Sequence, residues 1–202
     1  MRIGIIRTVG SPCRCAEAVA KGLESLGHQY LLVDSEEIEC RASEVARQCD
    51  LVVDHTDTFH GRGFFRPLVR LLLESHGARV VGSDARACLL GDNKPAAKTI
   101  LAEGGIPVPP GIVVNSEGWN RPPWLIPPLV LKPAFEHMSR GLRLAGTDDE
   151  AHSLSSNLLK SLHQPVLIEN YIPGRELAVS LLEGPKGLEV LQIGRASCRE
   201  RV

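Results

Sequence analysis

A lysine at the end of an apolar strand suggests a site for an anion. Lys132 follows the run Pro128-Leu129-Val130-Leu131, and an ammonium group placed there loses hydration unless an anion meets it. The next segment, residues 134–141, links two predicted strands and offers backbone donors, the Ser139 hydroxyl and the Arg140 cation. Because such groups can surround phosphate oxygens, these two segments favour phosphate binding.

A second set of groups could recognise a flat base and its sugar. Residues 166–172 (Val-Leu-Ile-Glu-Asn-Tyr-Ile) are predicted to form a strand that runs into a turn. Main-chain donors and acceptors in such a segment can bind an adenine ring while apolar side chains pack on its faces. Glu176 follows a Pro-Gly-Arg turn and is placed to accept hydrogen bonds from ribose hydroxyls. Taken singly, a lysine at a strand end is more often a surface residue, and Glu176 a solvated turn carboxylate.

The first ninety residues alternate predicted strands and helices. Strands are expected at residues 2–9, 30–33, 51–53 and 79–82, and helices at about 12–27, 42–48 and 67–74. Ser11 is suited to cap the first helix. Strands separated by helices pair in parallel through right-handed crossovers, which predicts an open α/β sheet. Ligands of such sheets lie beyond the carboxyl ends of the strands, so residues 8–13 and 54–63 should form the functional rim.

The pattern changes near residue 91. A helix is predicted from about Asp92 to Glu103, followed by a proline-rich connection and, later, an irregular loop at 115–128. The remaining strands look antiparallel, with one helix at about 148–162. They are expected at 112–114, 129–132, 142–145, 166–169, 177–183 and 188–191. We therefore expect an α/β domain at residues 1–90 and an α+β domain at residues 91–192.

Composition narrows the function classes. The chain has 202 residues, 43% of them hydrophobic, and a formal net charge of −1, so nothing indicates a nucleic-acid partner. No apolar run reaches the roughly 18–20 residues that span a bilayer, and the N-terminus does not fit a signal peptide. We expect a cytoplasmic protein without a membrane partner. The scattered cysteines are expected to be reduced and mostly buried: Cys13, Cys15, Cys40, Cys49 and Cys88.

The last ten residues look unlike the rest. Residues 193–202 (Ile-Gly-Arg-Ala-Ser-Cys-Arg-Glu-Arg-Val) resemble a translated sequencing adapter, and we exclude them as an artefactual tail. The natural protein is then expected to continue beyond Gln192, which makes the chain the front part of a longer protein.

The ordered set of motifs resembles the ATP-grasp superfamily, and among its members the D-alanine–D-alanine ligases and their relatives. The set comprises Asp92-Asn93-Lys94, the 129–133 strand, the 136–141 loop, residues 169–172 and Gly174-Arg175-Glu176-Leu177. The resemblance covers residues 1–192. It implies an N-terminal open parallel α/β (pre-ATP-grasp) domain followed by an incomplete α+β ATP-grasp domain. It also implies ATP and Mg²⁺ as cofactors, with the magnesium ligands and catalytic residues beyond residue 192.

The resemblance implies contacts to the phosphates of ATP. Lys94 and Lys132 would be the two phosphate-binding lysines, with Lys98 as the alternative to Lys94, because Asn93 separates Lys94 from its aspartate. Glu136, Ser139 and Gly141 match the flexible phosphate loop of the family. His137 and Met138 replace a small Gly-Ser pair, so the loop should close less freely.

The resemblance also implies a nucleoside site and a substrate rim. The adenine hinge would be Glu169, Asn170, Tyr171 and Ile172, and Glu176 would bind the ribose. His60-Gly61 resembles the His-Gly rim motif of the family. Arg14 lies where the D-alanine ligases carry a Glu-His pair, and would attract a carboxylate and repel an α-ammonium. ATP binding is therefore carried over, and D-alanine as the substrate is not.

The implied activity is that of an ATP-dependent carboxylate–amine ligase. A phosphoryl group would pass from ATP to a carboxylate, and an amine would attack the resulting acylphosphate. The substrates would be small molecules of amino-acid type, and a homodimer is compatible with this interpretation. Without the segment beyond residue 192, the chain should not turn over.

Three other interpretations compete with this one. A non-catalytic nucleotide-binding regulatory protein on a ligase-like fold is favoured by the altered phosphate loop. A plain dinucleotide-binding domain is disfavoured because no GxGxxG follows the first strand. Asp54, His55, Asp57 and His60 could bind a divalent metal, although residues of such a loop are more often hydrogen-bonded rim residues.

Overall fold

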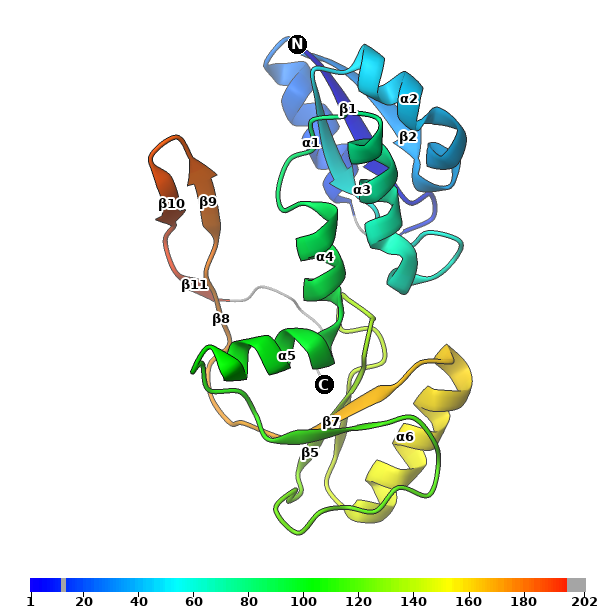
Figure 1. Cartoon of the computed structure of the whole chain (residues 1–202), viewed down its shortest axis with the longest axis vertical. Coiled ribbons are helices and arrows are strands. Elements are labelled where there is room, and N and C mark those ends of the chain that lie inside the picture. Colours follow the sequence, from blue (N-terminus) through cyan, green and yellow to red (C-terminus); the bar gives the residue numbers. More distant parts are fainter. Residues whose placement is uncertain (12–13, 196–202) are drawn as a thin grey trace. The chain divides into compact units, whose positions relative to one another are not determined.

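The computed structural model describes residues 1–11 and 14–195, and these residues form two compact units (Figure 1). The first unit is Met1–Val108 together with Ala134–His137, and the second is Pro109–Pro133 together with the residues from Met138 onward. The division falls at Val108 rather than residue 90 because α4 (Ala85–Asp92) contacts both α3 (Arg66–Ser75) and α5 (Lys94–Glu103). The domain bounds expected from the motifs stay a prediction.

The first unit contains a parallel sheet, as predicted. β1 (Arg2–Arg7) lies between β2 (Gln29–Asp34) and β3 (Leu51–His55), and both pairings are parallel. On one face, Ile5 of β1 packs with Ala16 and Ala20 of α1 (Cys15–Ser25). On the other, Ile6 packs with residues of α2 (Ile38–Gln48) and α3. The short turns η1 (Ser35–Glu37) and η2 (Gly63–Phe65) precede these two helices.

The fourth strand predicted at residues 79–82 is reduced to a single parallel bridge between Val80 and Val52 of β3. The cause is Arg70 of α3, which is 5% exposed. Its guanidinium donates to the carbonyl oxygens of Val80 (3.1 Å), Val81 (2.8 Å) and Gly82 (3.1 Å). Because these carbonyls accept from the buried guanidinium, they do not extend the hydrogen-bond ladder of the parallel sheet.

One helix boundary differs from the prediction, and one helix was not predicted. Ser11 does not cap α1, because its hydroxyl donates to Asp57, and α1 begins at Cys15 after Arg14. The helix that was not predicted is α4, whose start is marked by Asp84, since that side chain accepts from the amide of Ala87 at 2.8 Å. The glycine near the end of this helix obscured its apolar periodicity.

The cysteine prediction is partly wrong. Cys15 and Cys40 are exposed, whereas Cys49 and Cys88 are half-buried, and burial raises the pKa of both half-buried thiols. Cys13 lies outside the described residues. No helix of the described residues is long and apolar enough to cross a membrane.

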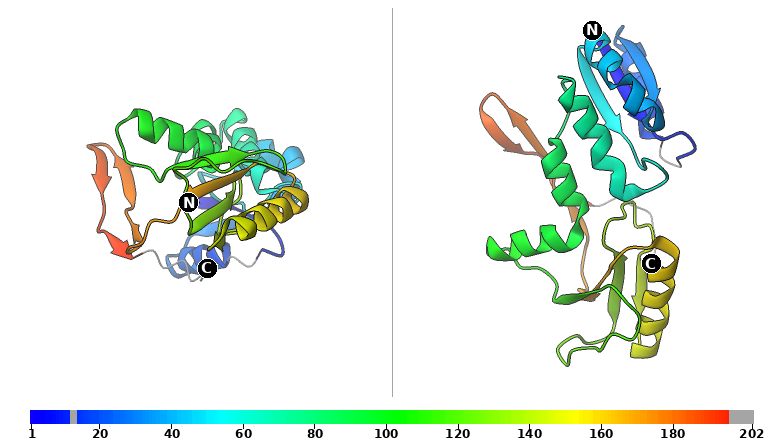
Figure 2. Two further views of the ribbon diagram at one scale, coloured as in Figure 1. Left: turned by 90° about the horizontal axis from the view of Figure 1, so that it is seen from below. Right: turned by 45° about the vertical axis from the view of Figure 1, so that its right-hand side comes forward.

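The second unit is built on an antiparallel sheet, again as predicted. Its strand order is β4 (Gly111–Val114), β7 (Val166–Asn170), β5 (Leu129–Pro133) and β6 (Arg143–Ala145). Figure 2 shows α6 (Asp148–Leu162) beside this sheet, where its Ala151 and Leu158 pack on strand residues. Thr147 caps α6 by accepting from the amide of Glu150 at 3.2 Å.

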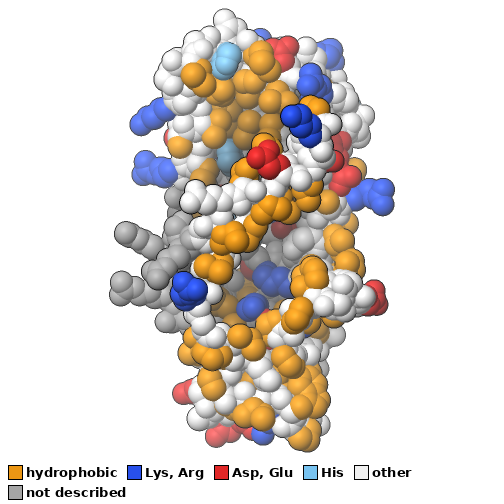
Figure 3. Space-filling view, turned by 90° about the vertical axis from the view of Figure 1, so that its left-hand side faces the viewer, with side chains coloured by type: hydrophobic (Ala, Val, Ile, Leu, Met, Phe, Trp, Pro, Cys, Tyr) orange, Lys and Arg blue, Asp and Glu red, His pale blue; other side chains and the backbone are white. Residues whose placement is uncertain are grey.

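The strand predicted at 177–183 is divided between two ladders. β8 (Leu177–Ala178) pairs with β11 (Gly194–Arg195), whereas β9 (Leu181–Gly184) pairs with β10 (Gly187–Val190). All residues of the β9–β10 hairpin are exposed. Figure 3 shows one face of the molecule with many exposed apolar side chains, and large ones occur in this hairpin and in α4 and α5. The rest of the expected artefactual tail, residues 196–202, lies outside the described residues.

Replacing Arg70 tests its role in the first unit. Arg70→Met should lower the free energy of unfolding by about 3 kcal/mol or more, because Glu74 loses its ion partner and buried carbonyls lose their donor. Circular dichroism in urea measures the loss. Both tryptophans lie in the second unit, so the fluorescence transition should move less. The exposed Arg79→Met is the matched control, and an equal effect there would contradict this role.

Candidate functional site

Lys94 lies at the start of α5, against the beginning of the 134–141 loop. Asn93 caps this helix by accepting from the amide of Ala96 at 3.2 Å. The Lys94 amide donates to the Ala134 carbonyl oxygen at 3.1 Å, and its ammonium donates to the Glu136 carbonyl oxygen. The residue inserted between the aspartate and the lysine is therefore the helix cap. Lys98, the alternative, lies one turn further along α5.

The aspartate of the same motif has a structural partner. Asp92 accepts from Arg66 Nε at 3.0 Å, and both side chains are largely buried. Burial lowers the pKa of Arg66, but the Asp92 hydrogen bond and charge raise it, and the net direction is upward. This pair ties the end of α4 to the start of α3, just before Lys94.

Lys132 meets a buried carboxylate in the second unit. Its Nζ lies 2.7 Å from Oε2 of Glu169, which is 4% exposed. Val130 lies opposite Glu169 across β5 and β7, and Lys132, two residues further on, shares its face of the sheet. The lysine side chain keeps about a third of its surface exposed. The anion that the sequence predicts for Lys132 is thus present in the protein itself.

The hinge segment is held by its neighbours. The amides of Asn170 and Tyr171 donate to the carbonyl oxygens of Pro110 and Pro128, each at 3.0 Å. The Asn170 side chain accepts from the amide of Ile126 at 3.0 Å and donates to the Trp124 carbonyl at 3.4 Å. Its side chain therefore attaches the irregular loop at 115–128 to β7. The next members of the predicted nucleoside site are exposed: Tyr171, Ile172 and Glu176.

Three residues in the second half of the 134–141 loop have backbone conformations in the left-handed region. Met138 and Ser139 have φ values of 52° and 55°, and Gly141 has 75°. A Cβ on Gly141 would lie 2.6 Å from Cγ of Pro133, so glycine is required both for the conformation and for space. Met138 is exposed, and Ser139 is partly exposed.

The predicted substrate rim is only partly assembled. Arg14 is exposed and precedes α1 without a side-chain cap. His60 lies near two glutamates instead, with Nδ1 3.2 Å from Glu36 and Nε2 3.1 Å from Glu39. Gly61 follows with φ 68°.

The rim also contains polar contacts that the sequence did not predict. Thr8 accepts from the amides of Asp57 (3.0 Å) and Thr58 (3.1 Å) through its hydroxyl. Arg7 pairs with Glu17 at 3.0 Å. A backbone hydrogen bond and the nearby arginine lower the pKa of Glu17. The position of Arg7 at the end of a buried strand, with Thr8 directly after it, was the available signal.

The proposed metal cluster does not assemble among the described residues, where no group of three His, Cys, Asp or Glu side chains could hold an ion. Asp54 accepts from the amide of Thr56 at 3.0 Å, and Asp57 contacts Ser11 and His137. These contacts fit hydrogen-bonded rim residues.

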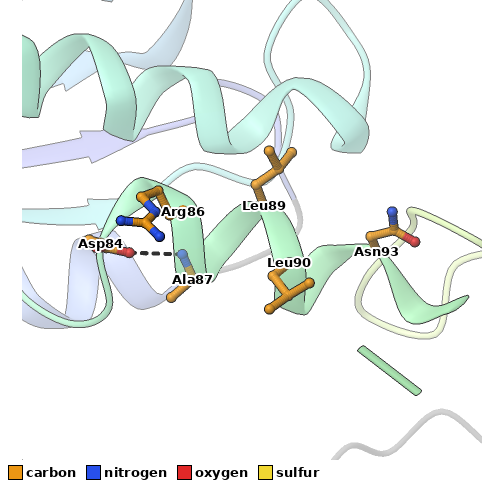
Figure 4. A pocket seen from close by; sticks show the side chains of 6 residues that line it. All are labelled: Asp84, Arg86, Ala87, Leu89, Leu90 and Asn93. Carbon is orange, nitrogen blue, oxygen red and sulfur yellow. Dashed lines mark hydrogen bonds between the residues drawn. The ribbon is translucent and has the colours of Figure 1, made fainter. Parts of the chain in front are cut away.

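Figure 4 shows an open pocket beside α4, close to the start of α5. Its lining residues are Asp84, Arg86, Ala87, Leu89, Leu90 and Asn93. Of these, only Asn93 belongs to a motif used in the sequence analysis. The pocket does not contain the residues predicted to bind nucleotide.

Sequence comparison finds similarity to ligases. The chain is 32% identical over 191 residues to the D-alanine–D-alanine ligase of Thermotoga petrophila, and 30% identical over 188 residues to that of Aquifex aeolicus. These matches cover 94% and 89% of the chain. The chain spans about 60% of the length of these relatives. No protein-family model matches it.

Solved ligases share the fold. The D-alanine–D-alanine ligase of Bacillus anthracis complexed with ATP superposes with a TM-score of 0.74 at 23% identity, over 98% of this chain and 67% of the other. D-alanyl-alanine synthetase A of Vibrio cholerae gives 0.75 at 18% identity, over 97% and 67%. The predicted resemblance and fold class are confirmed: homologues of this chain are D-alanine–D-alanine ligases, and its parallel and antiparallel sheets belong to a fold shared with solved ligases.

The Lys132–Glu169 pair can be tested by removing the cation. Lys132→Met should lower the stability of the second unit by about 1–3 kcal/mol, because a buried carboxylate loses a charged partner. Tryptophan fluorescence during urea unfolding reports on this unit, since it holds Trp119 and Trp124. Lys160→Met is the control because Lys160 is 66% exposed. Equal stability of both variants would contradict the importance of the pair.

Proposed function

We propose that the chain is the nucleotide-binding part of an ATP-dependent carboxylate–amine ligase. The observation that carries the proposal is the pairing of Lys94 with the start of the 134–141 loop in a fold shared with a solved ligase that holds ATP. A lysine beside such a loop can stabilise phosphate charge. The relatives that match the chain are ligases, which favours this activity over a regulatory binding protein.

In this proposal, different residues bind the phosphates, the adenine and the ribose of ATP. Lys94 and Lys132 contact phosphates, and the loop residues Glu136, Ser139 and Gly141 surround them. Adenine packs against the hinge from Glu169 to Ile172, where the Tyr171 carbonyl and the Ile172 amide, on exposed residues, can bind its edge. Glu176, exposed after a turn, accepts from the ribose hydroxyls.

The reaction follows from these contacts. The lysines offset the charge of the phosphoryl group as it passes from ATP to a carboxylate and ADP leaves. An amine then attacks the acylphosphate, which forms the amide and releases inorganic phosphate and a proton. Mg²⁺ would be needed for this step, but the described residues offer no set of ligands that fits it. The resemblance to the ligases favours metal ligands and catalytic residues beyond residue 192, and on that ground we expect the chain alone not to turn over.

The substrates are proposed to be small amino-acid-type molecules. Arg14, exposed at the rim of the first unit, would favour a carboxylate, and His60-Gly61 would lie nearby in the same rim. We also propose that the whole protein works in the cytoplasm as a homodimer.

Equilibrium binding tests the proposal. The chain should bind ATP, measured by titration calorimetry, more tightly than GTP. Lys132→Met and Lys94→Met should each weaken ATP binding roughly 10- to 100-fold, because a hydrogen bond to a charged group contributes about 1.5–3 kcal/mol. Lys160→Met, which replaces a largely exposed side chain of α6, should bind as the unchanged chain does. Equal affinity for all variants, or no binding at all, would contradict the proposal.

A further inference from the structure

Residues 134–137, here termed the 134–137 turn, are held on the rim of the first unit. They are the first half of the proposed phosphate loop, and they belong to the first unit by their contacts. The backbone of Ala134 and that of Glu136 accept from Lys94. The ring of Phe135 lies 4.5 Å from that of Phe64, measured between centroids. The turn therefore has contacts along its whole length.

His137 ends the turn beside a carboxylate. Its Nε2 lies 3.5 Å from Oδ1 of Asp57, and the two side chains are 25% and 18% exposed. Asp57 is itself oriented, since its other oxygen accepts from the Ser11 hydroxyl and its amide donates to Thr8 Oγ1 at 3.0 Å. The imidazole thus meets an acceptor that is already fixed on the rim.

Gly63 makes room for this arrangement. A Cβ at this position would lie 3.2 Å from Oε2 of Glu136 and 3.3 Å from Nδ1 of His137. The glycine has an ordinary backbone conformation, so the reason for it is space rather than φ. Both side chains of the turn pack directly on its backbone.

We propose that His137 is a positioning residue, which ties the phosphate loop to the rim through Asp57 and so holds Glu136 in place before nucleotide binds. Only the identity of the loop rests on the proposed function. A preset loop loses less conformational entropy on binding than a free one. Where the resemblance predicts small flexible residues, this chain instead has a side chain that anchors the loop.

Limited trypsin digestion tests the tether directly. Arg140 follows the turn and is exposed, so cleavage after it reports release of the loop. His137→Ala and Asp57→Asn should each speed this cleavage about 2- to 5-fold, the range for a partly exposed polar contact, and the double variant should be no faster than either. Unchanged rates, or effects that multiply, would overturn the tether.

Controls separate release of the loop from unfolding. Arg47 lies within α2 of the same unit, and its cleavage should not change in any variant. Gly63→Ala should act like His137→Ala, whereas Gly22→Ala, where a methyl meets nothing within 4 Å, should not. His76→Ala replaces an exposed histidine and should match the unchanged chain. If His137→Ala speeds cleavage at Arg47 too, the unit itself has become less stable. The rates of cleavage after Arg140 and after Arg47 in His137→Gln, which keeps size and polarity, then distinguish release of the loop from unfolding.

The positioning role needs a second readout. ATP affinity should fall about 2- to 5-fold in His137→Ala and in Asp57→Asn, in line with the cleavage ratio. Faster cleavage with unchanged ATP affinity would overturn the positioning role. Digestion requires no nucleotide, so a chain that shows the coupled cleavage but binds no ATP would contradict the proposed function and leave the tether standing. Tight ATP binding with unchanged cleavage would support the proposed function and overturn the tether.

Discussion

A carboxylate buried inside an antiparallel sheet is the constraint on which the second unit depends. Glu169 lies on β7, which pairs with β4 and β5 on its two sides. Burial of a charge costs several kcal/mol unless a partner of opposite charge is close. Lys132, on the adjacent strand, supplies that partner at 2.7 Å. The need to keep this pair explains a lysine at the end of an otherwise apolar strand, and it leaves a cation on the sheet face.

The first unit uses side-chain cations on backbone carbonyls in a similar way. Arg70 binds the carbonyls of residues 80–82, and Lys94 binds that of Glu136. In both cases a charged donor from a helix fixes an irregular segment. Arg70 ends the sheet, and Lys94 places the 134–137 turn. The irregular segments near the rim are thus held by a few strong contacts rather than by regular secondary structure.

Much of the fold was predictable because its signals are local. Alternating apolar strands and helices predicted the parallel sheet, and the later strands predicted the antiparallel one. The failures involve contacts between distant residues. The segment at 79–82 resembles a strand until Arg70 binds its carbonyls, and Ser11 resembles a helix cap until Asp57 accepts its hydroxyl. No pattern within a short window contains either partner.

The same distinction between local signals and contacts of distant residues applies to the candidate site. The sequence predicted an anion for Lys132, but not that Glu169, itself assigned to the adenine hinge, would be that anion. Asn170 was assigned to the hinge, and its side chain instead holds the loop at Trp124 and Ile126. The residue types and their order indicate what kind of ligand fits. Which groups the protein uses internally depends on strand register and loop packing.

The central claim is that ATP binds with its adenine against the β7 hinge. Photolabelling with 8-azido-ATP followed by peptide mapping tests it most directly. If the base lies against the β7 hinge, the label should fall within residues 166–176 of the second unit, and excess ATP should abolish it. Label confined to residues 1–90, or label that ATP does not displace, would contradict the account.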